Sequence, residues 1–316
     1  MSAGRLAGPA IGLAVAMLLL LLPLTLRGYG IYLMSLWAVL TIAAMGLNLT
    51  LGYAGQVSLA QGAFVGIGAY AAALLTTAGW PLALGMAVGV GLGLVVGWLL
   101  GYPALRVQHH YLAFVTLGAN TLVFLVLRNE DWLTGGVYGI PAIPRPRIFG
   151  LPTDDPLVFY YFCLAMLLLV TLALGLLLRS PWGRAFEALR ENPVRAESLG
   201  IDTRRYTLLA FAIGSAVGSL AGTVYAPLVQ YIDPYPFALG LSLNLLLMVV
   251  VGGSGRFFGP WLGAAIAVLL PEWLRFSEGL YLIFYAVLVI LVLLFLPGGL
   301  MGIAARLRGG RRSVAG

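Results

Sequence analysis

The longest uncharged stretch of this chain restricts what the chain can fold into. Residues 28–105 contain no Asp, Glu, Lys or Arg. A helix that crosses a membrane needs about 20 apolar residues, so this stretch alone has room for three crossings. The whole chain is 61% hydrophobic and only 9% charged, whereas soluble domains carry about 25% charged residues. These values exclude a soluble globular protein.

Apolar runs separated by charged residues or by Gly and Pro predict about ten membrane helices, with eight or nine as alternatives. The eighth and ninth runs are shorter than the roughly 17 residues needed to cross, so they are expected to form a helical hairpin or a broken pair. The first run is typical of a signal anchor. A signal peptide is its alternative, but no small-x-small cleavage site follows the run. The predicted helices lie near residues 10–27, 31–50, 57–78, 82–101, 111–128, 157–178, 206–227, 238–252, 258–273 and 280–297.

These runs predict an all-α polytopic membrane protein. One membrane domain is expected over residues 1–305, and a basic cytoplasmic tail over residues 306–316. Cytoplasmic loops keep an excess of positive charge. Ten alternating crossings that start inside place thirteen of the eighteen basic residues on the cytoplasmic side. Both termini are therefore expected to be cytoplasmic.

The inventory of reactive side chains argues against an enzyme. All eighteen basic residues are Arg, so the chain has neither the lysine of a Walker A loop nor a lysine for Schiff-base chemistry. The single cysteine, Cys163, lies in an apolar run, and the adjacent His109 and His110 do not complete a zinc set. Asp154 and Asp155 lie together in a predicted loop, as solvated turn residues do. We expect no catalytic residue, no metal and no cofactor on this chain, and no nucleic-acid partner.

The predicted inner loop, residues 179–205, contains six Arg and four acidic residues. Asn192 is a favourable N-cap, Pro193 suits the first position of a helix and Gly200 suits its end, so two short helices are expected to meet at Asn192. Attraction to phospholipid alone would favour Arg without interleaved acids, so the mixture favours docking on a protein. A solvated loop that only fixes topology is the alternative. The predicted docking residues are Arg184, Phe186, Glu187, Leu189, Arg190, Glu191, Asn192, Arg195 and Glu197.

A polar segment lies at predicted membrane depth. Gln56, Ser58 and Gln61 occur beside several glycines, where a helix is able to break. Irregular backbone in a bilayer is tolerated only where protein buries it or where it lines an aqueous cavity. Two interpretations remain open: these side chains border the translocation path, or they tie helices together by hydrogen bonds. The path candidates are Asn48, Gln56, Ser58, Gln61, Thr116, Asn120 and Asn244.

Glycine accounts for 42 of the 316 residues, about twice its usual share of roughly 7%. Close helix packing is the expected use, with small-x-x-x-small pairs at Gly62 and Gly66 and at Gly259 and Gly263. Each pair follows a glycine-rich turn, residues 52–56 and 252–256 respectively. This correspondence is typical of an internal repeat.

Three motifs occur in order along the chain. Residues 52–64 read Gly-Tyr-Ala-Gly-Gln-Val-Ser-Leu-Ala-Gln-Gly-Ala-Phe, residues 183–192 read Gly-Arg-Ala-Phe-Glu-Ala-Leu-Arg-Glu-Asn, and residues 252–255 read Gly-Gly-Ser-Gly. Together with Ala196–Ile201, Ala221-Gly222 and Gly259-Pro260, they make the chain resemble the LivM-type permeases of branched-chain amino-acid ABC importers, over roughly residues 30–300.

The resemblance implies the fold of a type II ABC importer permease in a bacterial inner membrane. It implies a second, LivH-type permease, two cytoplasmic ATPase subunits that hold ATP and Mg, and an extracytoplasmic substrate-binding protein. Membrane lipid surrounds such a subunit. Residues 182–200 would be the coupling region that seats in an ATPase. The implied solutes are branched-chain or similar apolar amino acids, and related importers for urea, short amides or other amino acids are the alternative.

An ion-coupled secondary carrier and an intramembrane enzyme are competing functions. A coupled carrier usually needs an ionisable side chain within its spans, and the middles of the long apolar runs contain no Asp, Glu or Arg. No His lies within a predicted span either. Both observations favour a permease whose energy comes from another chain.

Overall fold

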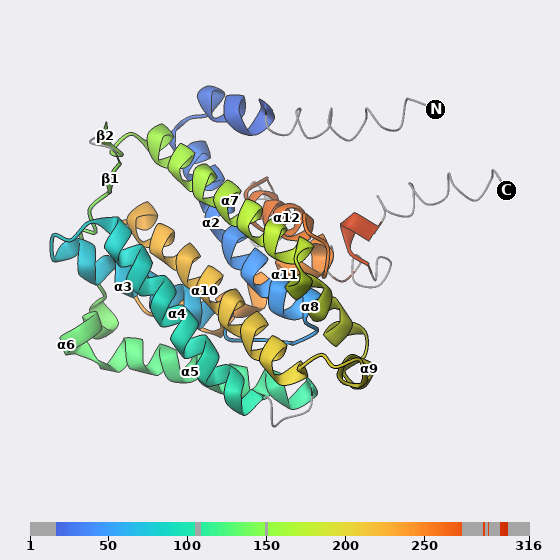
Figure 1. Cartoon of the computed structure of the whole chain (residues 1–316). Helices are drawn as coiled ribbons and strands as arrows, with labels where there is room; N and C mark the ends of the chain where they lie inside the picture. The colour runs from blue at the N-terminus through green and yellow to red at the C-terminus, as the bar shows by residue number, and fades with distance from the viewer. Residues whose placement is uncertain are drawn as a thin grey trace, which may run out of the picture.

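The computed structural model describes residues 17–104, 109–148, 151–273 and 298–302, together with the single residues 287 and 290. Its helices form a bundle around α10 (Thr203–Val229), which lies against α2 (Gly28–Leu47), α3 (Gln61–Thr77) and α4 (Leu82–Ala104). α10 buries mostly small residues, among them three glycines that allow the neighbouring helices to approach. Figure 1 shows α10 running between the helices of the N-terminal half.

The bundle has two distinct ends, one at each end of α7 (Pro156–Arg179). In Figure 1 the two short strands lie at one end of α7, and α8 and α9 lie at the other. We call these the cap end and the hairpin end. The remaining elements are η1 (Asn48–Tyr53), α5 (His109–Asn129), α6 (Asp131–Thr134), η2 (Gly136–Tyr138), β1 (Arg147–Ile148), β2 (Leu151–Pro152), α8 (Pro181–Glu191), α9 (Pro193–Ser198), η3 (Tyr235–Phe237), α11 (Leu239–Gly252) and α12 (Gly259–Trp273).

Most predicted helices appear at the expected places. Five described helices are long and apolar enough to cross a membrane, and three more are apolar but shorter, at 61–77, 239–252 and 259–272. The short eighth and ninth runs form α11 and α12, which pack against each other. The predicted helix at 10–27 is described only from residue 17, and it is helical over residues 17–25. The predicted tail 306–316 lies outside the described residues, as does the helix at 280–297 except for residues 287 and 290.

The predicted break between the second and third runs is present and longer than expected. α2 changes at Asn48 into the π-helical turn η1, and an irregular segment then runs to Ala60. The third helix therefore begins at Gln61, four residues later than predicted. π-helical turns occur frequently at functional sites, which directs attention to this segment.

The loop after α5 contains regular structure of its own. It contains the four-residue helix α6, the 3-10 turn η2, and the strands β1 and β2, which pair antiparallel. Ile140 also forms an isolated antiparallel bridge with Ile232, with N–O distances of 2.9 and 3.2 Å. Asp233 stabilises the turn before η3, because its Oδ1 accepts a hydrogen bond from the Tyr235 N–H at 2.9 Å. These small strands are a departure from a purely α-helical chain.

Glycines hold α11 and α12 in direct backbone contact. A Cβ added to Gly263 would overlap the carbonyl oxygen of Met248, and one added to Gly259 would overlap the carbonyl of Gly253. On α3 the neighbours of Gly62 and Gly66 are mostly side chains, with Ser242 Oγ 2.9 Å from a Cβ on Gly62. Both predicted pairs thus occupy places where a side chain has little room.

The tightest contacts of α3 involve two glycines outside the predicted pairs, Gly68 and Gly222. A Cβ on Gly68 would overlap the carbonyl oxygen of Ser219 on α10, and a Cβ on Gly222 would overlap that of Val65. These two contacts bring α3 and α10 together backbone to backbone. Ser219 Oγ also donates a hydrogen bond to the carbonyl of Phe64 at 2.9 Å.

Candidate functional site: the hairpin and the polar segment

The hairpin consists of two short helices, as predicted, and each is capped by its own sequence. Ser180 and Asn192 are the N-caps of α8 and α9, and their side chains accept hydrogen bonds from the N–H groups of Trp182 and Arg195, at 3.2 and 3.0 Å. Proline follows each cap at the first helical position, where the missing N–H is not needed. The turn after α9 ends at Gly200 with φ of +83°. Local signals alone therefore define the hairpin.

One face of α8 attaches the hairpin to the bundle. Phe186 is fully buried and Leu189 is 6% exposed. The Phe186 ring packs edge-on against Tyr206 at the start of α10, with ring centroids 6.1 Å apart. These two predicted docking residues therefore contact this chain, and burying them holds α8 against α10.

The hairpin also exposes apolar side chains. Trp182, Val194 and Leu199 are 44%, 76% and 80% exposed. The predicted docking residue Asn192 is partly buried by its capping role. The charged predicted docking residues are all exposed around these apolar side chains: Arg184, Glu187, Arg190, Glu191, Arg195 and Glu197. This surface combines charges of both signs with exposed apolar groups.

Two path candidates tie distant segments together. Gln61 is 1% exposed, and its Nε2 donates to the carbonyls of Ala43 on α2 and Gly214 on α10, at 3.0 and 3.2 Å. Asn48 is 3% exposed, and its amide bonds the backbone of Gly255 and Arg256. Both amides make the interhelical hydrogen bonds that the alternative interpretation describes.

The start of α3 is capped by side chains from other helices. Its N-cap, Ala60, offers no side-chain acceptor. Ser242 Oγ on α11 accepts from the Gly62 N–H at 2.8 Å, and Asn120 Oδ1 on α5 accepts from the Ala63 N–H at 2.9 Å. Ser242 also donates to Asn120 Oδ1 at 3.0 Å. The N–H groups of a helix that begins at membrane depth need such acceptors, because no water is available in the bilayer core.

Polar side chains also satisfy the irregular segment that precedes α3. Thr116 Oγ1 accepts from the Leu59 N–H at 2.9 Å, and Ser58 Oγ accepts from the Ala60 N–H at 3.3 Å. Both side chains are 1% exposed. Their hydrogen bonds explain how non-helical backbone is accommodated here. Ser242, which completes this network, was missed by sequence reasoning because it lies in an ordinary apolar run.

Two path candidates keep unused hydrogen-bonding atoms. Gln56 Oε1 and Asn120 Nδ2 are buried and have no hydrogen-bond partner among the described residues. Most buried polar atoms in proteins are paired, so these two atoms are exceptions that a structural role alone does not explain. Asn244, by contrast, is exposed on the surface of α11 and does not join the buried set.

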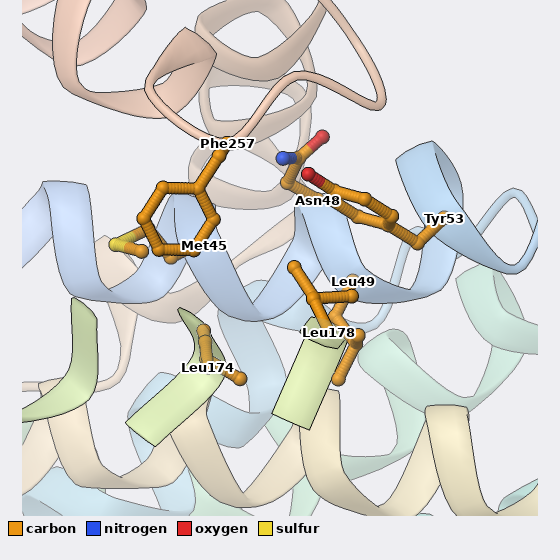
Figure 2. Close-up of a pocket in the computed structure, with 7 residues that line it drawn as sticks. All are labelled: Met45, Asn48, Leu49, Tyr53, Leu174, Leu178 and Phe257. Atoms are coloured by element: carbon orange, nitrogen blue, oxygen red, sulfur yellow. The ribbon is translucent and has the colours of Figure 1, made fainter. Parts of the chain in front are cut away.

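A small pocket lies beside η1 at the hairpin end. Met45, Asn48, Leu49 and Tyr53 line it from α2 and η1, and the other lining residues are Leu174, Leu178 and Phe257. Figure 2 shows the Phe257 ring over Met45, with the Asn48 amide directed toward the loop that carries Phe257. The lining is mostly apolar. Within the described part of the chain, no group of three or more His, Cys, Asp or Glu is placed to hold a metal ion.

Comparisons with known proteins identify the chain's family. The model of a family described as branched-chain amino acid transport system / permease component matches residues 29–296. The permease protein LivM of the high-affinity branched-chain amino acid transport system of Escherichia coli K12 is 34% identical, over 84% of this chain and 68% of its own length. A probable LivM of Methanocaldococcus jannaschii is 29% identical, over 66% of this chain and 65% of its own length.

A relative with a different named solute is the autoinducer 2 import system permease protein LsrC of Escherichia coli O9:H4. It is 26% identical, over 74% of this chain and 66% of its own length. No solved structure matches the chain. The matched relatives are named as permeases, and the apolar helices described above are those of a multi-pass membrane protein. The chain belongs to the family of branched-chain amino acid transport system permease components.

Proposed function

We propose that this chain is a membrane-spanning subunit of an ABC importer in a bacterial inner membrane, and that it passes branched-chain or similar apolar amino acids. An extracytoplasmic binding protein delivers the solute, and two partner ATPases supply the energy. A second, LivH-type permease completes the pathway. Both termini and the hairpin end face the cytoplasm, and the cap end faces the binding protein.

The hairpin is the observation that carries this proposal. α8 and α9 are folded by their own caps and held to α10 by Phe186, so the hairpin is a rigid projection. Trp182, Val194 and Leu199 are exposed on it, among charges of both signs. A partner protein that covers these side chains would bury apolar surface and meet complementary charges. An ATPase that supplies energy to this chain is the partner that such a projection suits.

Purification with the products of neighbouring genes tests the assembly. We expect a second permease and two ATPases to co-elute, and proteoliposomes of the complex to take up leucine only with ATP inside and the binding protein outside. Elution of the chain alone, with leucine uptake driven by an ion gradient, would establish a secondary carrier instead. Leucine and autoinducer 2 offered as competing solutes separate the substrate classes.

Charge reversal on the hairpin tests the docking surface. Glu187→Arg or Glu191→Arg should lower ATP-driven uptake, because each replaces a carboxylate by a positive charge at a partner surface that is complementary to the carboxylate. Like charges that face each other across an interface weaken binding. Both side chains are exposed, so membrane insertion should be unchanged. Asp154→Arg, a reversal at the exposed cap end, is the matched control. Normal ATPase pull-down and normal uptake in both hairpin variants would leave the loop as a solvated topology signal.

Gln56 and Asn120 are the strongest candidates for residues of the translocation path. Their unpaired buried atoms lie on or beside the irregular segment, where backbone in a membrane is expected to be buried in protein or to line a cavity. Gln56→Ala should change the dependence of uptake on leucine concentration, while Gln61→Ala should instead reduce assembly, since Gln61 ties α2 to α10. Unchanged kinetics and assembly in both variants would refute this assignment.

A further inference from the structure

Two glycine turns that are far apart in sequence contact each other at the hairpin end. One turn, residues 52–56, ends η1, and the other, residues 252–256, follows α11. A Cβ on Gly52 would overlap the backbone nitrogen of Gly255, and one on Gly255 would lie 2.6 Å from the carbonyl oxygen of Gly52. The two main chains therefore contact each other directly.

Asn48 fastens the two turns together. Its Nδ2 donates to the carbonyl of Arg256 at 3.0 Å, and its Oδ1 accepts from the N–H of Gly255 at 2.9 Å. One amide thus bonds a donor and an acceptor of the same turn. The π-helical geometry of η1 begins at Asn48, so the fastening lies where α2 departs from regular helix. Figure 2 shows this amide pointing out of its helix toward the loop after α11.

Helix α8 of the hairpin contacts both turns. A Cβ at Gly55 would lie 3.3 Å from the Cα of Arg190, and a Cβ at Gly255 would overlap the Nη1 atom of Arg190. The Tyr53 phenol interacts electrostatically with both Glu187 and Arg190. Gly55 and Gly255 have φ of +71° and +75°, so glycine fits both the backbone conformation and the close approach. These contacts place α8 directly against both turns.

We propose that Asn48, the two glycine turns and Arg190 form a mechanical joint that converts movement of α8 into movement of α2 and α11 together. This proposal rests on the proposed function, in which partner ATPases move α8. Arg190 transmits the displacement, and Asn48 keeps the turns from separating. Asn48 and Arg190 are positioning residues, and neither needs to contact the solute.

The experiment measures leucine imported per ATP hydrolysed by the purified complex in proteoliposomes. Asn48→Ala should leave the subunits associated, because a side chain that is 3% exposed is not available to a partner. ATP hydrolysis should stay within about twofold of the parent value, while leucine imported per ATP should fall about thirtyfold, because two hydrogen bonds worth about 1 kcal/mol each are lost and every 1.4 kcal/mol is a factor of ten. A role in folding alone would lower uptake and hydrolysis in parallel, which would overturn the proposal.

Glycine variants provide a matched test of the turn contact. Gly255→Ala should also lower leucine imported per ATP, because its Cβ would force Gly52 and Arg190 away. Gly79→Ala is the control, since Gly79 has φ of +86° and nothing within 4 Å of the added Cβ. Equal ratios in these two variants would overturn the proposal.

Two arginine variants keep the proposal testable if the variants at buried positions fail to fold. Arg190→Ala changes an exposed side chain and should lower leucine imported per ATP in an assembled complex. Arg204→Ala, another exposed arginine near the hairpin, should retain the parent ratio. If Arg190→Ala imported as much leucine per ATP as the parent, the proposed joint would be refuted. Absence of ATP-dependent uptake by the parent complex would instead refute the proposed function, so the two failures are distinguishable.

Discussion

Replacing Ser242 by Ala tests whether α3 depends on caps supplied by other helices. Ser242 Oγ accepts from the Gly62 N–H at 2.8 Å and donates to Asn120 Oδ1 at 3.0 Å. Its removal leaves the Gly62 N–H buried without an acceptor. Losing an N-cap costs about 1 kcal/mol, and a buried donor left unpaired costs about 1–3 kcal/mol. Interhelical hydrogen bonds in membrane proteins average only about 0.6 kcal/mol, so we expect a total loss of about 2 kcal/mol.

The single cysteine provides the assay. Cys163 is fully buried on α7, so a thiol-reactive fluorophore reports when the bundle opens during heating in detergent. At about 2.1 cal/mol/K of unfolding entropy per residue, a chain of 316 residues loses about 1.5 °C of Tm per kcal/mol, which predicts that Ser242→Ala lowers the midpoint by about 3 °C. Thr121→Ala is the control, because the exposed Thr121 hydroxyl bonds only the carbonyl of Leu117 in its own helix.

A double-mutant cycle sharpens the test. Ser242 and Asn120 share a hydrogen bond, so the losses from Ser242→Ala and Asn120→Ala should be non-additive by about 1 kcal/mol. Equal midpoints for Ser242→Ala and Thr121→Ala would refute the reasoning, since they would show that α3 begins without needing an acceptor from α11. Additive losses in the cycle would separately refute a shared network.

Two further substitutions test packing at other places. Gly263→Val forces α12 away from the Met248 carbonyl, so we expect the variant to lose the single symmetric peak of the parent in size-exclusion chromatography. Gly91→Val is the control and should keep that peak, because nothing lies within 4 Å of the Cβ position at Gly91. Phe186→Ala removes a fully buried ring, which typically costs about 3–5 kcal/mol, so trypsin should cleave the hairpin faster than in the parent, while Trp182→Ala, which alters a side chain that is 44% exposed, should leave the cleavage rate unchanged.

Features with local signals were predictable from the sequence. The hairpin follows from an N-cap followed by proline at Asn192 and a terminating Gly200, and each of these signals acts over a few residues. The break after α2 follows from polar side chains beside glycines. The short eighth and ninth runs were recognisable by length alone, because the bilayer sets how long a crossing must be.

Features that depend on distant contacts were not predictable. Ser242 and Asn244 are two residues apart on α11, but successive residues of a helix are rotated by about 100°, so the two side chains face different directions. Ser242 is buried and Asn244 is exposed, and only the packing of α11 distinguishes them. In the same way, helical spacing identified Phe186 and Leu189 as one apolar face without showing that their partner is α10 of the same chain.

The caps at the start of α3 impose an order on how the chain is built. α3 is synthesised early, but the hydroxyl that accepts from the Gly62 N–H lies 180 residues further along. At about 5–20 residues per second, that acceptor arrives roughly 10–40 seconds later. Until then the Gly62 N–H in the first turn of α3 has no acceptor, and lipid does not supply one. We therefore expect the nascent α3 to stay at the membrane surface or inside the insertion machinery until α11 is made.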